Sequence, residues 1–291
     1  EAISGEAAEN FTETLVKDED AAQIYYTSGT TGRPKGVVLT HKNVYIHALM
    51  TVAELHLVDK DVWLHAAPLF HLADAWATWA ITWVGATHVC VRTFRPKEVL
   101  QTMQQQGVTF TNMVPTMLNM LVNEPSVEAL SFPNLRAILS GGAPIAPEVV
   151  RKIMKVFKCE YIQTYGMTET SPYLTMSILK ENLLGLNDEE KFRFRAKTGR
   201  PTLAVDLRVV DDKGRDVPKD GESVGEIVVR GDTVTKGYWR LPEETERAIV
   251  DGWLHTGDLA TIDREGYVNI VDRKKDMIIT GGENVYSTEV E

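Results

Sequence analysis

Cysteine is scarce in this sequence. Its 291 residues include two cysteines, Cys90 and Cys159, and their separation matches no metal-ligand spacing. A disulfide framework therefore does not organise the fold, and two reduced, packed thiols fit a cytosolic setting. The first twenty residues are acidic and lack the basic start and apolar middle of a secretory signal. We expect a cytoplasmic protein.

Long apolar runs and an excess of positive charge are also missing. The most apolar stretch, residues 76–91, is interrupted by threonine, glycine and histidine, and is too short and mixed for a membrane-spanning helix. The 31 basic and 41 acidic residues give a formal net charge of −10, which repels nucleic acids and anionic membranes. We expect no nucleic-acid partner and no integral membrane association, and the sequence leaves the oligomeric state open.

Helical and strand-like patterns alternate through roughly the first two thirds of the chain. Residues 43–54 and 147–157 have helical patterns, and residues 86–91 and 108–113 have strand composition. We read residues 76–91 as a buried helix followed by a strand. This alternation predicts an α/β fold with a mainly parallel sheet and flanking helices.

After Arg200 the sequence consists of short apolar runs separated by turns, which predicts a smaller β-rich subdomain. Residues 179–197 are charged and poor in β-formers, so we expect a surface excursion there. We divide the chain into residues 1–200, an α/β nucleotide- and acyl-binding subdomain incomplete at its N-terminus, residues 201–271, the β-rich subdomain, and residues 272–291, a hinge and the start of a truncated C-terminal domain.

The most informative segment is residues 27–36, T-S-G-T-T-G-R-P-K-G, between strand-like residues 23–26 and 37–39. Its glycines allow backbone N–H groups to turn toward an anion, its hydroxyls add uncharged donors, and Lys35 adds a mobile ammonium. The residues expected to contact phosphate are Thr27, Ser28, Gly29, Thr30, Thr31, Gly32 and Lys35. A flexible Gly/Ser/Thr linker explains the pattern poorly. The G-x-x-x-x-G-K-[ST] pattern is absent, which disfavours a kinase or GTPase of that type.

Two further segments offer polar groups at strand ends. Residues 165–170, Y-G-M-T-E-T, combine a ring that can stack on a purine, a hydroxyl that can reach a phosphate and a carboxylate that can hold magnesium. By themselves they could equally be a helix start capped by Thr168. Residues 140–144, S-G-G-A-P, leave bare backbone where a flat base could lie, although an ordinary strand-to-helix turn fits as well.

Three other segments are weaker on local grounds. Asp258, in W-L-H-T-G-D, could accept both hydroxyls of a ribose, but a lone aspartate of this kind is usually a turn residue. Residues 272–276, D-R-K-K-D, would by default be a solvated turn. His71, at the end of P-L-F-H, would by default be structural.

Together and in this order, the segments resemble the signature set of the adenylate-forming superfamily, which includes acyl-CoA synthetases, peptide-synthetase adenylation domains and firefly luciferase. The resemblance extends from about Asp20 to the last residue. In such enzymes ATP and a carboxylate give an acyl-adenylate and pyrophosphate, and a thiol then captures the acyl group. The resemblance therefore implies a small-molecule carboxylic acid, ATP, Mg²⁺ and coenzyme A as the partners of this protein.

The resemblance also implies roles for individual residues. The phosphate loop up to Lys35 would hold the β- and γ-phosphates, Thr168 would touch the α-phosphate, and Asp258 would hold the ribose with help from Arg273. Glu169 and Thr27 would bind magnesium. The residues implied around the adenine are Gly141, Gly142, Ala143 and Tyr165, and Gly166 is also implied in cofactor binding. The implied catalytic residues are Lys35, His71, Thr168 and Glu169.

His71 would gate the acyl pocket, and Lys275 would lie at the hinge of the C-terminal domain. The C-terminal lysine of the family would fall beyond Glu291, so we interpret the sequence as an internal fragment that adenylates slowly. Residues 278–291 resemble the acyl-CoA synthetase version of this region rather than the peptide-synthetase version. A peptide-synthetase-type adenylation activity and a nucleotide-binding pseudo-enzyme remain alternatives.

The acyl group is the least constrained part of the interpretation. Apolar and aromatic residues near His71 and in the other motifs suggest a pocket for a fatty or aryl acid. The candidate wall residues are Leu72, Ala73, Trp76, Trp79, Val114, Met167 and Tyr173. We expect Asp74, the one charge in this stretch, to face solvent.

Overall fold

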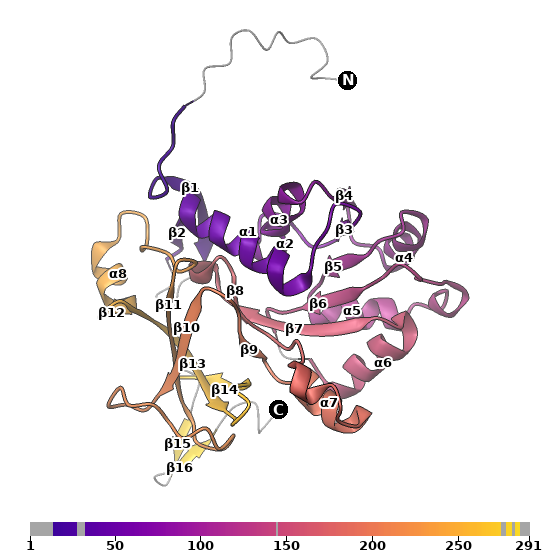
Figure 1. Cartoon of the computed structure of the whole chain (residues 1–291). Helices are drawn as coiled ribbons and strands as arrows, with labels where there is room; N and C mark the ends of the chain where they lie inside the picture. Colours follow the sequence, from indigo (N-terminus) through magenta and orange to yellow (C-terminus); the bar gives the residue numbers. More distant parts are fainter. Residues whose placement is uncertain (1–13, 28–32, 144, 275–277, 281–282, 286–291) are drawn as a thin grey trace.

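The computed structural model describes residues 14–27, 33–143, 145–274, 278–280 and 283–285 (Figure 1). Its largest element is a seven-stranded sheet in which the first five strands are parallel and the last two run antiparallel to their neighbours. In spatial order the strands are β4 (Thr87–Cys90), β3 (Val62–His65), β5 (Phe110–Asn112), β6 (Ala137–Ser140), β7 (Glu160–Gly166), β8 (Tyr173–Met176) and β9 (Arg200–Pro201). The expected mainly parallel α/β fold is confirmed.

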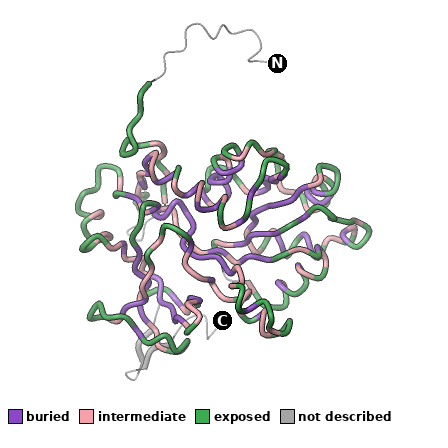
Figure 2. Tube along the Cα trace, in the orientation of Figure 1, coloured by how far each residue is buried: buried purple, intermediate pink, exposed green. Residues whose placement is uncertain are grey.

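Helices cover both faces of this sheet. One face carries α1 (His41–Leu55), α2 (Leu72–Ala75) and α3 (Ala77–Trp83), and the other carries α4 (Pro96–Gln105), α5 (Pro115–Val122) and α6 (Pro147–Phe157). The two apolar cores follow from the twofold alternation of strand side chains, because Trp63 packs in one core and Leu64 in the other. Figure 2 shows the central strands as the most buried part of the molecule. Each large apolar side chain buried in this way contributes about 1.5–3 kcal/mol.

Local sequence explains where several helices begin. Thr40 caps α1, since its hydroxyl accepts from the Asn43 N–H at 3.2 Å while the Asn43 side chain accepts from the Thr40 N–H at 2.9 Å. Proline occupies the first turn of α4, α5 and α6, where its missing N–H costs nothing. The expected helix at residues 147–157 has these bounds in the structure.

The remaining strands form a second sheet and two hairpins, to one side of the seven-stranded sheet in Figure 1. A second sheet is antiparallel and has the order β10 (Val205–Val210), β11 (Gly225–Gly231), β13 (Trp253–Ile262) and β12 (Ile249–Val250), with β14 (Val268–Arg273) also paired to β13. The predicted β-rich region after Arg200 is therefore present, while the division into domains stays a prediction. Two hairpins complete the strands, β1 (Ala21–Thr27) with β2 (Lys35–Thr40) and β15 (Ile278–Thr280) with β16 (Glu283–Val285). The other helices are α7 (Asp188–Arg195), α8 (Pro242–Ala248) and the short 3₁₀ turns η2 (Val127–Ala129), η3 (Thr168–Thr170) and η4 (Glu181–Leu183).

The excursion at residues 179–197 contains η4 and α7, and Phe192 of α7 is buried against the core beneath α6. Across the residues that the structure describes, none of the helices has the length and apolarity needed to cross a bilayer.

Candidate functional site

The phosphate loop joins two paired strands, as the sequence indicates. Thr27 is the last residue of β1 and Lys35 the first of β2, and the two are opposite each other in the antiparallel register. They hold the two ends of the loop together. Ser28, Gly29, Thr30, Thr31 and Gly32 lie outside the described residues.

Lys35 lies in a cluster of polar and aromatic side chains. Its Nζ is 2.5 Å from Oε2 of Glu244 on α8 and 5.0 Å from the centre of the Tyr238 ring. The Tyr238 hydroxyl donates to Oε1 of Glu169 at 2.9 Å, and Glu169 is buried. Burial raises the pKa of Tyr238, so this hydroxyl stays protonated and remains a donor. Tyr238 thus contacts both the expected phosphate lysine and the expected magnesium carboxylate.

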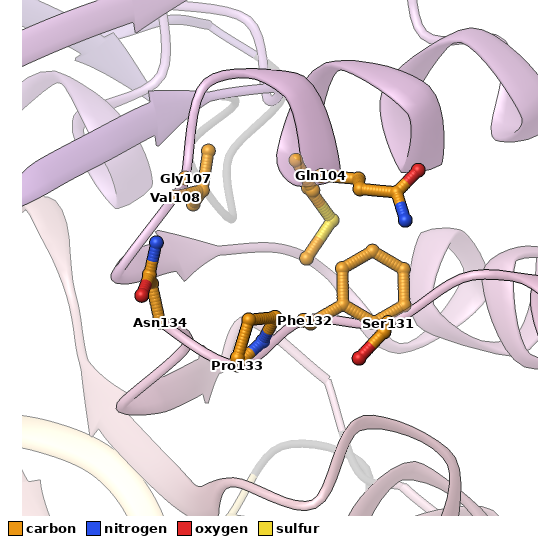
Figure 3. A pocket seen from close by; sticks show the side chains of 8 residues that line it. Gln104, Gly107, Val108, Ser131, Phe132, Pro133 and Asn134 are labelled. Atoms are coloured by element: carbon orange, nitrogen blue, oxygen red, sulfur yellow. The ribbon is translucent and has the colours of Figure 1, made fainter.

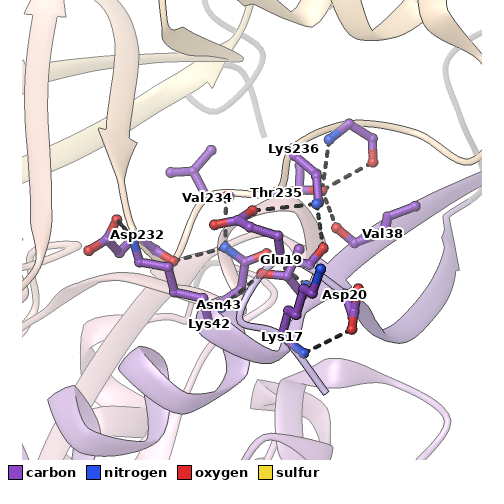
Figure 4. A network of polar contacts seen from close by, with 12 residues as sticks. Lys17, Glu19, Asp20, Val38, Lys42, Asn43, Asp232, Val234, Thr235 and Lys236 are labelled. Atoms are coloured by element: carbon purple, nitrogen blue, oxygen red, sulfur yellow. Dashed lines mark hydrogen bonds and ion pairs between the residues drawn. The ribbon is translucent and has the colours of Figure 1, made fainter. Parts of the chain in front are cut away.

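A polar network fixes the backbone segment that precedes Tyr238 (Figure 4). The Asn43 amide donates to the carbonyl oxygens of Asp232 and Val234 at 2.8 and 3.0 Å, and the Thr235 hydroxyl donates to the Val38 carbonyl at 2.5 Å. The Thr235 N–H donates to the carbonyl of Glu169 at 2.7 Å. The segment is therefore held between β2, the start of α1 and η3.

A second cluster joins Tyr165, Asp258 and Arg273. The Tyr165 hydroxyl donates to Oδ2 of Asp258 at 2.7 Å, and Nε of Arg273 lies 3.2 Å from Oδ1. Burial raises the pKa of Tyr165 and also that of Asp258. Asp258 lies within β13, opposite Arg273 of β14, so its interpretation as a turn residue is wrong. The structure brings together three residues that are 93 and 15 positions apart in the sequence.

A cavity of about 460 Å³ lies beside α2, at the carboxyl ends of β5, β6 and β7. It brings together His71, which precedes α2, Gly141 and Gly142, which follow β6, and Gly166 and Thr168, at the end of β7 and the start of η3. Ligands of open α/β sheets bind at this end of the strands. The cavity is also lined by Ala67, Pro68, Leu72, Ala73, Asn112, Met113, Val114, Met117, Thr164, Met167, Pro172 and Tyr173.

Two glycines of the cavity are required by close backbone packing. A Cβ at Gly141 would lie 2.5 Å from the Thr164 hydroxyl, and one at Gly166 would lie 1.9 Å from the Pro172 carbonyl oxygen. Gly141 therefore allows β6 and β7 to approach each other, whether or not a base lies over it. Ala143 is exposed and is not among the lining residues. Thr168 begins η3 and does not cap it, because the N-cap residue is Met167.

Two expectations about the acyl pocket are wrong. Trp76 is buried in the core, with its ring against Trp63 and Tyr173, and Trp79 is 43% exposed, and neither lines the cavity. Trp76 lies between α2 and α3, and its indole N–H donates to the hydroxyl of Tyr173 at 3.0 Å.

Asp74 does not face solvent. It is fully buried and accepts hydrogen bonds from Trp63 Nε1 at 3.1 Å and from His65 Nδ1 at 3.0 Å. The other nitrogen of His65 lies 2.9 Å from Nδ1 of His88. The carboxylate thus connects α2, which carries part of the cavity wall, to β3 and β4.

His71 itself is exposed at the cavity mouth, with its ring 4.4 Å from that of Phe70. Lys275 lies outside the described residues.

Another cavity, of about 220 Å³, is shown in Figure 3. Gly107 and Val108 precede β5, and Asn134 precedes β6, so this cavity is at the amino ends of the strands. It contains none of the expected site residues. The carboxyl-end cavity is therefore the better candidate for a substrate site.

The donor set around Glu169 fits magnesium rather than a metal held by protein ligands alone. Among the described residues no group of three or more His, Cys, Asp or Glu side chains is placed to bind a metal ion. Mg²⁺ is commonly held by one or two carboxylates together with substrate phosphates. The buried carboxylate of Glu169, linked to Lys35 through Tyr238, meets that requirement.

Comparison with known proteins identifies the family. A family model described as "AMP-binding enzyme" matches residues 2–239. The chain therefore belongs to the AMP-binding enzyme family, and the resemblance to adenylate-forming enzymes is confirmed.

Individual relatives agree with this assignment. The chain is 39% identical over 281 residues to a long-chain-fatty-acid–CoA ligase of Thermus thermophilus, covering 95% of this chain and 52% of that protein. It is 39% identical over 274 residues to a feruloyl-CoA synthase of an Amycolatopsis species, covering 94% and 53%. The chain thus spans about half the length of the curated relatives it matches.

A solved structure is also similar. The O-succinylbenzoate coenzyme A synthetase of Bacillus subtilis, in complex with ATP and magnesium ion, superposes with a TM-score of 0.84 at 34% identity, covering 99% of this chain and 57% of that one.

Proposed function

We propose that this protein uses ATP to convert a carboxylic acid into an acyl-adenylate and then into a thioester with coenzyme A. The observation that carries the proposal is the cavity in which His71, Thr168 and the two glycines after β6 meet, beside the clusters of Lys35 and Asp258. The family assignment and the CoA ligases and synthetases among the relatives support the same reaction. The activity is that of an AMP-forming acid–thiol ligase.

In the first step, a carboxylate oxygen attacks the α-phosphorus of ATP. The bond from that phosphorus to the bridging oxygen breaks, and its electron pair leaves with pyrophosphate. Two anions must approach each other, so the chief requirement is to neutralise charge on the phosphate oxygens. No protein nucleophile is needed.

Charged and polar groups of the two clusters and of the cavity are suited to binding ATP and neutralising its phosphates. The ammonium of Lys35, at the end of the phosphate loop, would bind the β- and γ-phosphates, and the hydroxyl of Thr168 would donate to an α-phosphate oxygen. Asp258 would accept hydrogen bonds from the ribose hydroxyls, and Tyr165, which orients that carboxylate, would lie against the adenine. These roles are proposals.

Thr27 and Glu169 would hold Mg²⁺, which when bound supplies positive charge to the phosphate oxygens. Glu169 suits this role because Tyr238 fixes one of its oxygens without adding a positive charge. His71, at the cavity mouth, would lie beside the reacting carboxylate.

In the second step, the thiolate of coenzyme A attacks the acyl carbon. The bond between that carbon and the phosphate oxygen of AMP breaks, and its electron pair leaves with AMP.

We propose a fatty or aryl acid as the substrate, because the cavity wall includes Leu72, Val114, Met117 and Met167. A volume of about 460 Å³ lies in the range of sites for small organic ligands.

The test is a panel of carboxylic acids graded in chain length and ring content, with release of AMP measured with and without coenzyme A. We expect CoA-dependent AMP release with apolar acids and little with acetate. The proposal fails if ATP binds but no acid in the panel releases pyrophosphate. We also propose a cytoplasmic location, because the sequence has two cysteines that fit reduced thiols. Cell fractionation tests this location.

A further inference from the structure

Lys35 already has an anionic partner within the chain. Its ion pair with Glu244 joins residues 209 positions apart, and the two side chains are only 14% and 22% exposed. Lys35 holds the pKa of the Glu244 carboxyl below its usual value, so that group is ionised at neutral pH. The Lys35 ammonium, which the proposed function assigns to the triphosphate, is therefore already paired with a carboxylate of the chain itself.

The location of Glu244 is determined by the surrounding structure. The Tyr238 N–H donates to the Thr245 hydroxyl at 3.0 Å, which ties α8 to the Tyr238 turn. That turn follows the segment held by Asn43 and Val38, shown in Figure 4. Arg247, one turn along α8, donates to the other oxygen of Glu244 at 2.8 Å. Glu244 is thus presented to Lys35 from a tethered helix.

We propose that Glu244 pairs with the Lys35 ammonium and competes for it with the phosphates of ATP and of pyrophosphate. This inference rests on the proposed function. Transfer of Lys35 to a phosphate breaks one charged hydrogen bond and forms another, so the net gain on binding is smaller than for an unpaired lysine. The same competition favours the return of Lys35 to Glu244 when pyrophosphate leaves.

The test is the affinity of the 291-residue chain for MgATP and for pyrophosphate, measured by calorimetry. Glu244→Gln keeps the size of the side chain and removes its charge. We expect both ligands to bind about threefold to thirtyfold more tightly, which is less than the full effect of one charged hydrogen bond because both side chains are partly exposed to solvent. A purely structural role for Glu244 would instead leave the affinity unchanged or weaken it, and either result would overturn the inference.

Glu243 provides a matched control on the same helix. It carries the same charge, its side chain is 84% exposed, and its partner is Arg247 at 3.5 Å. Glu243→Gln measures the effect of removing one negative charge from α8, and we expect less than about a twofold change, as for a screened surface charge.

Lys35→Met separates this inference from the proposed function. If Lys35→Met binds MgATP as tightly as the unmodified chain, the proposed phosphate site is wrong. If it binds more weakly, the site stands, and the gain from Glu244→Gln should disappear in the double variant. A gain that persists in full without Lys35 would mean that Glu244 acts by simple repulsion, which contradicts the inference.

Discussion

Replacement of Asp74 tests whether this buried carboxylate holds the cavity wall together. Asp74→Ala removes the acceptor of the Trp63 indole N–H and of the His65 ring, both of which are buried. Each buried donor left without a partner costs about 1–3 kcal/mol. Part of this loss is offset because the variant no longer desolvates a carboxylate. We therefore expect the free energy of unfolding to fall by about 2–4 kcal/mol.

Urea unfolding at pH 7 measures this loss, with two further variants for comparison. Asp74→Asn keeps an acceptor for Trp63, and His65 can move its proton to the nitrogen that faces His88, so we expect a loss of only about 1 kcal/mol. Asp206→Ala removes an exposed ion pair with Arg230 and should cost less than about 1 kcal/mol. If Asp74→Ala costs no more than Asp206→Ala, the hydrogen bonds of Asp74 do not stabilise the fold, and our account of α2 is wrong.

Two other predictions concern pH and nucleotide affinity. Burial lowers the pKa of His47 to about 3 from 6.5, so the unfolded chain binds a proton that the folded chain excludes between these values. Stability should be constant with respect to this group above pH 6.5 and fall by about 1.4 kcal/mol per pH unit below it. His47→Gln, which can still accept from the Tyr173 N–H, should remove this part of the slope in unfolding curves at pH 5 to 7, and an unchanged slope would contradict the assignment. Asp258→Asn removes a charged acceptor and should weaken MgATP binding by about tenfold in calorimetry. Asp206→Asn, which changes an exposed carboxylate, is the control. Equal affinities of the two variants would mean that Asp258 is not part of the nucleotide site.

Local sequence patterns predicted the elements whose signals are complete within one segment. The helix at residues 147–157 begins with proline and has apolar residues at helical spacing, and both signals lie inside the element. Strands β1 and β2 were predicted in the same way, from strand composition on both sides of a glycine-rich loop. The resemblance to a family then supplied the order and the roles of the motifs, which local patterns left undecided.

Side-chain partners from distant segments could not be predicted. Asp74 was expected to face solvent because a charged side chain is rarely fully buried. Its partners His65 and His88 belong to two strands that become neighbours of α2 only in the folded sheet. Trp76 was wrongly placed in the pocket wall for the same reason, since the rings that bury it come from β3 and β8.

Tyr238 and Glu244 were not identified from the sequence at all. Proline followed by two glutamates indicates the start of α8, and this signal accounts for Glu244 without any function. The contact with Lys35 depends on pairing between β2 and the segment before Tyr238, which are about 200 residues apart. The roles of the individual site residues remain predictions, including those that the structure brings together.

The groups that hold the carboxylates of the two clusters decide whether each carboxylate keeps its negative charge available for binding. Tyr238 holds Glu169 through a hydroxyl whose pKa is raised by burial. A lysine in its place would orient the carboxylate equally well but would neutralise it. A neutral donor fixes the position of the carboxylate and leaves its charge available to a metal ion. Asp258 differs, because it accepts from the Tyr165 hydroxyl and also forms an ion pair with Arg273. The cation Lys35 is then paired with a different carboxylate, on α8, so the charges that we propose to attract phosphate and magnesium are kept on separate partners.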